Sequence, residues 1–191
     1  MILRLFRRTP RTSSIAGLYG MIVAQARTPE FYRNYGVPDT VNGRFEMIAL
    51  HTVLLLRRLA EAPLPLRRLG QEVFDRFCED MDASMREMGV GDLAVPRKMR
   101  RVGAAFYARQ TEYGEALASG GFERLEAVLA QNVFGGTPTS REGVECLARY
   151  VRAAADAFAT QNNEAIARSE LRFPDPAQVS PALGACSGPM A

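Results

Sequence analysis

The chain has 191 residues, 47% of them hydrophobic and 24% charged, a balance that excludes a disordered or fibrous protein and predicts one globular domain. The net charge of +3 comes from the first eleven residues, which hold four arginines and no acid, because the other 180 residues carry 20 basic and 21 acidic side chains. A nucleic-acid-binding domain usually spreads its basic residues over a folded face, so this distribution disfavours one.

The N-terminal segment, residues 1–12, mixes arginines with apolar residues and lacks the separate apolar stretch of an export signal. Two interpretations stay open: an arm that contacts an anionic membrane surface, or a solvated terminus. The arginine-rich, acid-free start also resembles an organelle presequence, although it is very short for one. The longest apolar run, 47–56, is about half the length that spans a bilayer. We therefore expect a cytoplasmic protein whose membrane contact is peripheral.

Hydrophobic residues recur at helical spacing almost throughout, and no segment shows the alternation typical of a β-strand. The first helix is predicted over about 13–26. The run Thr28-Pro29-Glu30 begins a short second helix that ends near Tyr35. The segment 41–61 is apolar on nearly all sides, which is typical of a central buried helix.

The helical pattern continues through the second half of the chain. Thr139 and Glu142 form a capping box that begins a last long helix, whose apolar stripe extends to Ile166. The segment 173–191 is rich in proline, glycine, alanine and serine and is expected to be a disordered tail. The remaining helices are predicted over about 66–88, 96–117 and 122–134. The sequence thus predicts one all-α domain, 13–172, with flexible ends at 1–12 and 173–191.

The residue inventory excludes several kinds of chemistry. Three cysteines stand 68 and 40 residues apart, so no zinc-ligand spacing exists, and so sparse an odd number argues against a disulfide framework. Lys98 is the only lysine and does not stand in a Gly-Lys-Ser/Thr context, which excludes a phosphate-binding P-loop. A single histidine without a partner makes a nucleophile–histidine relay improbable. We expect no enzyme and no cofactor.

The predicted core includes Phe45, His51, Phe106 and Tyr107. Apolar residues stand three and four positions from His51 on its helix. A haem ligand or proton shuttle is one interpretation of this histidine. A buried histidine with an internal hydrogen-bond partner is the favoured one.

Two basic clusters are candidates for binding phosphates or acidic proteins. The first cluster consists of Arg57, Arg58, Arg67 and Arg68. Arg57 and Arg58 end a predicted helix, where the helix dipole favours cations, so their charge has a structural explanation. The second cluster stands at a helix start, where cations oppose the dipole, and is therefore the better candidate for a contact; it consists of Arg97, Lys98, Arg100 and Arg101. It lacks the interleaved aromatic residues that stack on bases.

The order of several motifs carries a resemblance. The chain reads Ala26-Arg-Thr-Pro-Glu-Phe-Tyr32, Gly36-Val-Pro-Asp-Thr40 and Gly43-Arg-Phe-Glu46 before Leu50-His51, and later Met85-Arg-Glu-Met-Gly-Val-Gly-Asp92 and Phe106-Tyr-Ala-Arg109. This ordered set resembles the ubiquinol–cytochrome c chaperone family, in its bacterial branch, over about residues 13–170.

The resemblance implies an all-α, non-enzymatic assembly factor. Mitochondrial members of the family assist the synthesis and assembly of cytochrome b for complex III, with a small partner protein and near the ribosome. By this resemblance the chain binds newly made cytochrome b, or its ribosome, at the inner membrane. We expect Phe31, Tyr32 and Tyr35 to border a partly exposed partner surface. Asp39 and Arg44 either join that surface or form an ion pair that fixes the turn.

Two alternatives remain open. The arginine clusters suit an RNA- or ribosome-binding helical protein, whose binding would weaken steeply with salt. An enzyme with a site around Tyr107, Glu112 and Tyr113 is the second alternative, although no acid–base or nucleophile pair is evident. A deep polar pocket would favour the enzyme, whereas an apolar surface groove would disfavour it.

Overall fold

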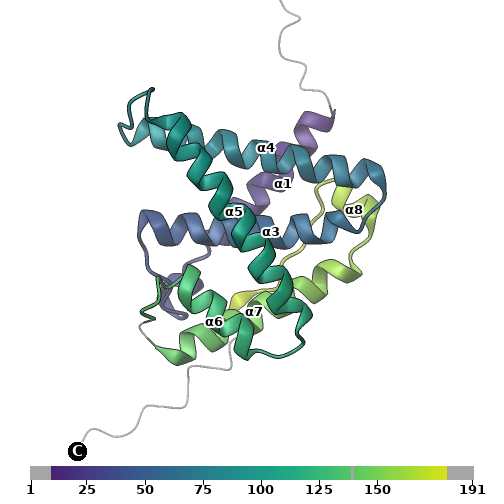
Figure 1. The fold of residues 1–191 in the computed structure, drawn as a ribbon. Helices are drawn as coiled ribbons and strands as arrows, with labels where there is room; N and C mark the ends of the chain where they lie inside the picture. Colours follow the sequence, from purple (N-terminus) through teal and green to yellow (C-terminus); the bar gives the residue numbers. More distant parts are fainter. Residues whose placement is uncertain (1–9, 139, 180–191) are drawn as a thin grey trace, which may run out of the picture.

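The computed structural model describes residues 10–138 and 140–179, and within these ranges every regular element is an α-helix (Figure 1). The predicted all-α class is confirmed. The helices are α1 (Pro10–Ala26), α2 (Pro29–Arg33), α3 (Val41–Ala60), α4 (Leu64–Glu87), α5 (Val95–Ala118), α6 (Glu123–Asn132), α7 (Arg141–Thr160), α8 (Asn163–Ala167) and α9 (Pro176–Val179).

Helix α3 is the centre of the fold, as its composition predicts. It contacts α1, α4, α5 and α7, and Figure 1 shows α3 running across the middle of the molecule with α5 crossing it. Every residue from Glu46 to Leu55 is buried, which explains why this helix is apolar on nearly all sides.

The starts of α3 and α7 hold the turn between α2 and α3 from two sides. A Cβ atom added to Gly43 would lie 2.0 Å from the carbonyl oxygen of Pro38, and one added to Gly143 would lie 2.1 Å from that of Tyr35. No side chain fits at such distances, so both positions require glycine. The turn is thereby fixed against two helices that are about 100 residues apart in the chain.

The predicted start and end of the last long helix are both wrong. Thr139 lies outside the described residues, and the N-cap is Ser140, whose Oγ accepts a 3.0 Å hydrogen bond from the Gly143 amide. The helix ends at Thr160 instead of continuing to Ile166. A second cap interrupts it, because Asn162 accepts a bond from the amide of Glu164 and begins α8.

The expected disorder from residue 173 is wrong for 173–179. The Phe173 ring lies 5.1 Å from that of Phe158, and the Tyr35 hydroxyl donates to the Pro176 carbonyl oxygen at 2.7 Å. Composition suggested a tail, but the Phe173 ring and hydrogen bonds from Tyr35 and Gln25 to the carbonyl oxygens of Pro176 and Pro174 anchor this segment to the core. Residues 180–191 lie outside the described residues, as do 1–9 of the predicted arm; helix α1 begins at Pro10 instead of Ser13.

The lengths and hydropathies of the helices also bear on membranes. Within 10–138 and 140–179, no helix combines the length and the apolar character that crossing a bilayer requires.

Candidate functional site

An apolar groove opens where α3, α4 and α5 meet. It has a volume of about 280 Å³, an apolar floor and a rim of polar side chains. The lining consists of Leu56, Leu59, Ala60, Arg67, Gly70, Gln71, Phe74, Phe106, Tyr107 and Gln110. A groove of this composition can hold apolar side chains of a partner.

Aromatic rings form one wall of the groove. The Phe74 ring lies 4.9 Å from that of Phe106 and 5.8 Å from that of Tyr107, and Phe77 backs Phe106 at 5.1 Å. Tyr107 is 60% exposed, so its predicted place in the core is wrong. Phe106 points inward, and the next residue of a helix is rotated by about 100°, which turns Tyr107 toward the groove and solvent.

The other predicted core residues lie in or beside the core. Phe106 and His51 are fully buried, whereas Phe45 is partly buried and packs against the core. Both nitrogens of His51 have partners: Nδ1 lies 2.7 Å from the Met47 carbonyl oxygen and Nε2 lies 2.9 Å from the Tyr150 hydroxyl. Burial lowers the pKa of His51 to about 4, so the ring is neutral at pH 7. The favoured interpretation of His51 as an internally bonded histidine agrees with this geometry.

A buried ion pair joins α3 to α5 and went unnoticed in the sequence. The Arg109 guanidinium donates to both carboxylate oxygens of Glu46 at 2.5 Å. Glu46 is only 3% exposed, and its burial raises the pKa of the carboxyl group more than Arg109 lowers it. Glu46 ends the Gly43–Glu46 motif and Arg109 ends the Phe106–Arg109 motif. Their places in two motifs of the same family were the available signal that the two side chains form a pair.

The predicted aromatic partner surface is only partly realised. Phe31 and Tyr35 are buried, so the expectation that they border an exposed surface is wrong. Helix α2 has only five residues and inserts Phe31 against the rings of Tyr35, His51 and Tyr150.

A hollow of about 430 Å³ does bring Tyr32, Asp39 and Arg44 together, with Arg27 and Arg33 beside them. Asp39 and Arg44 form an exposed ion pair at 2.6 Å, as one of the two interpretations predicted, and Arg44 lowers the pKa of Asp39.

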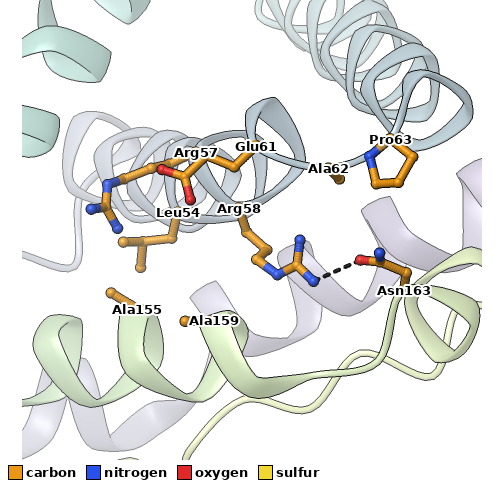
Figure 2. A pocket seen from close by; sticks show the side chains of 9 residues that line it. All are labelled: Leu54, Arg57, Arg58, Glu61, Ala62, Pro63, Ala155, Ala159 and Asn163. Carbon is orange, nitrogen blue, oxygen red and sulfur yellow. Dashed lines mark hydrogen bonds between the residues drawn. The ribbon is translucent and has the colours of Figure 1, made fainter.

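The side chains of Arg57 and Arg58 do not converge on a common point. Both line a pocket of about 280 Å³ shown in Figure 2, where their guanidinium groups point in opposite directions. Arg58 donates to the carbonyl oxygens of Phe158 and Gln161 and to Asn163 Oδ1, at 2.8, 3.1 and 2.7 Å. It therefore caps the end of α7 and joins it to α8, which is a structural role.

The second basic cluster keeps its charges free. The side chains of Arg97, Lys98, Arg100 and Arg101 are all exposed, and they make no hydrogen bond or ion pair with the described part of the chain. Arg67 and Arg68, at the start of α4, are likewise exposed and unpaired there.

Comparison with known proteins places the chain. Residues 33–173, about three quarters of it, match the model of a family described as Ubiquinol-cytochrome C chaperone. The chain belongs to this family. The resemblance drawn from the ordered motifs is thus confirmed.

Relatives of this ubiquinol-cytochrome C chaperone family member include eukaryotic proteins named as assembly factors. The chain is 25% identical to ubiquinol-cytochrome-c reductase complex assembly factor 1 of Xenopus laevis over 71% of its own length and 67% of the relative's. Against the Mus musculus protein of the same name it is 25% identical over 77% of its length, but spans only 50% of that protein.

A solved structure extends the similarity to the fold. The crystal structure of the Cbp3 homolog from Brucella abortus aligns with a TM-score of 0.83 and 36% sequence identity. The alignment covers 93% of this chain and 99% of the other. The family match includes α3, α4, α5 and the apolar groove between them.

Proposed function

We propose that the chain is an assembly chaperone for ubiquinol–cytochrome c reductase, complex III, and that newly made cytochrome b is its client. Family membership over 33–173 and the names of the relatives support the role in assembly. The observation that carries the choice of site is the apolar groove beside the exposed ring of Tyr107. An apolar surface groove suits binding better than acid–base catalysis, which disfavours the alternative of an enzyme around Tyr107, Glu112 and Tyr113.

The groove suits brief protection of an apolar segment. Its volume, about 280 Å³, admits a few side chains and not a whole helix. Burying one large apolar side chain is worth about 1.5–3 kcal/mol, so two or three such contacts give binding that reverses readily. The polar rim, with Arg67, Gln71 and Gln110, keeps the empty groove hydrated.

The proposal also places the chain peripherally at the inner membrane, where a client such as cytochrome b is inserted. The ribosome and a small partner protein are further proposed contacts, in keeping with the resemblance. For the groove itself, the occupant is an apolar segment of the client before it joins its final neighbours.

Photo-crosslinking tests the client and the site together. A photoreactive phenylalanine analogue replaces Tyr107 in cells, and the control replaces Phe122, which is 41% exposed and lies outside the groove. We expect a crosslink to cytochrome b, detected with a specific antibody, from position 107 and not from position 122. Crosslinking from 122 alone would contradict the groove.

Cells that lack the chain test the function independently. Their membranes should lose b-type haem absorbance in reduced-minus-oxidised spectra, together with cytochrome b protein, and the intact gene should restore both. A normal amount of cytochrome b in such cells would contradict the proposal that cytochrome b is the client.

RNA or ribosome binding is a second candidate function. It rests on the four unpaired cations of the second basic cluster. Binding of labelled ribosomal RNA to the purified chain would test it, and a phosphate-driven complex must weaken steeply between about 50 and 200 mM salt.

A further inference from the structure

The turn between α4 and α5 exposes apolar side chains at a corner of the molecule. Leu93 is 99% exposed and Met88 is 56% exposed. The Ala94 amide donates to the Gly91 carbonyl oxygen at 2.8 Å, closing a turn that holds Leu93 outward. In Figure 1 this turn extends beyond the neighbouring helices. We call residues 86–101 the α4–α5 tip.

Four cations follow this turn on one side of α5. At about 100° per residue, Arg97, Lys98, Arg100 and Arg101 fall within an arc of about 160°. The opposite side of the helix carries Met99, which packs against the core. The cations therefore form one continuous basic face next to exposed Leu93.

The acids of the tip do not neutralise this face. Asp92 pairs with Arg86, which also binds Asp82 at 2.6 Å. Glu87 is the other acid of the tip, so residues 86–101 hold five cations and two acids, a net charge of +3. The positive charge of the basic face is thus available to an anionic partner outside the chain.

We propose that the α4–α5 tip docks on an anionic lipid surface. Leu93 and Met88 enter the interface between headgroups and acyl chains, and the basic face binds the phosphates of the headgroups. This inference extends the proposed peripheral placement from the undescribed N-terminal arm to a defined surface of the folded domain.

The exposed leucine distinguishes lipid from RNA as the occupant. Transfer of an apolar side chain from water to an apolar medium lowers its free energy, and the phosphate backbone of RNA offers no apolar medium. Base stacking needs aromatic side chains, and the sequence has no aromatic residue between Phe77 and Phe106. Charge and hydrophobicity together therefore favour an anionic bilayer.

Sedimentation of the full chain with vesicles tests the charged face. The vesicles contain phosphatidylcholine alone or with about one third phosphatidylglycerol. We expect binding only to the anionic vesicles. Removing two cations with Arg97→Gln and Arg101→Gln should weaken it by about 25-fold, at about fivefold per cation. The matched control, Arg68→Gln with Arg172→Gln, removes two exposed arginines that lie outside both the tip and the groove and should bind like the unaltered chain.

A single tryptophan tests insertion of the apolar tip. The chain contains no tryptophan, so Leu93→Trp introduces a unique fluorophore. Its emission should shift to shorter wavelength when anionic vesicles are added and should be quenched by lipids brominated on their acyl chains. The control Val41→Trp, at a site that is 67% exposed at the start of α3, should show neither change.

The outcomes separate this inference from the wider proposal. The proposal for the tip would be overturned if binding to anionic vesicles were unchanged by the Arg97 and Arg101 substitutions and Leu93→Trp showed no emission shift. Peripheral placement would then depend on another segment of the chain. No vesicle binding by the unaltered chain would overturn both. Binding of poly-uridine RNA, lost with the same two arginines and without vesicle binding, would assign the face to RNA instead. None of these outcomes bears on cytochrome b crosslinking.

Discussion

Gly43 and Gly143 are the residues at which the backbone leaves least room for a side chain. Alanine at position 143 would put its Cβ 2.1 Å from the Tyr35 carbonyl oxygen, so the turn or helix α7 must move. We expect Gly143→Ala to lower the free energy of unfolding by about 3 kcal/mol. Gly114 lies inside α5 with nothing within 4 Å of an added Cβ, and Gly114→Ala should raise it by about 1 kcal/mol. Chemical denaturation measures both; equal effects would contradict the close approach.

The buried histidine makes stability depend on pH. Its pKa is about 4 in the folded chain against an ordinary 6.5, so the unfolded chain binds more protons between these values. Stability from His51 is therefore complete above pH 6.5 and is lost as pH falls toward 4. The free energy of unfolding should fall by about 2 kcal/mol more between pH 7 and pH 5 in the unaltered chain than in His51→Gln.

The comparison with His51→Gln is needed because Glu46 acts in the opposite sense. Its raised pKa contributes stability at low pH that is lost as pH rises, and this contribution is common to both chains. Urea denaturation at several pH values gives the two curves. Parallel curves would show that His51 is charged or accessible in the folded chain.

Single residues divide into those that spacing can predict and those that it cannot. The burial of His51 follows from its apolar neighbours, and the Asp39–Arg44 pair from opposite charges across a short turn. The exposure of Phe31 and Tyr107 was predicted wrongly. Exposure depends on which element packs against a helix face, and the sequence does not specify that element. Phe31 meets Tyr150 from α7, and Tyr107 faces the groove.

Between elements, the Glu46–Arg109 pair is the main polar link from α3 to α5. Each partner is buried enough that removing the other leaves an uncompensated charge. Glu46→Leu and Arg109→Leu should each cost about 2–3 kcal/mol, and the double variant should cost less than their sum. A double-mutant cycle in chemical denaturation gives the coupling; additive losses would mean that the pair contributes no mutual stabilisation.

The segment 173–179, after α8, packs against the core although its composition predicted disorder. A chain that ends after Arg172 loses the Phe173 ring and the bond from the Tyr35 hydroxyl to Pro176. Against a chain that ends after Val179, we expect its unfolding free energy to be about 3 kcal/mol lower. Equal thermal midpoints for the two chains would show that residues 173–179 do not stabilise the core.

Periodicity predicted the long helices well, because each buries a continuous apolar stripe. Their ends were less predictable: Ser140 and not Thr139 caps α7, and Asn162 separates α8 from it. The apolar groove was not predictable, because it forms from three helices whose packing the sequence leaves unspecified. The basic face of α5 was predictable, since its four cations are adjacent in the chain.

At the scale of the whole molecule, α5 connects the groove to the α4–α5 tip. Tyr107 stands seven residues, two helical turns, after Arg100 and so lies at the Arg100 edge of the basic face of α5. Tyr107, in the groove, stands 12 residues, about 18 Å along the helix, from Val95, where α5 begins. A tip that rests on headgroups would hold the groove within reach of a client segment at the membrane surface.

The two surfaces use different physics and should respond differently to salt. Vesicle binding through the tip depends on charge and should weaken at least tenfold when salt rises from about 50 to 500 mM, because the screening length shortens to a few ångströms. Client capture in the groove depends on apolar burial and should change little over the same range. Sedimentation with anionic vesicles and crosslinking from position 107 measure the two in parallel. Crosslinking that falls with salt as steeply as vesicle binding would mean that charge, and not the groove, holds the client.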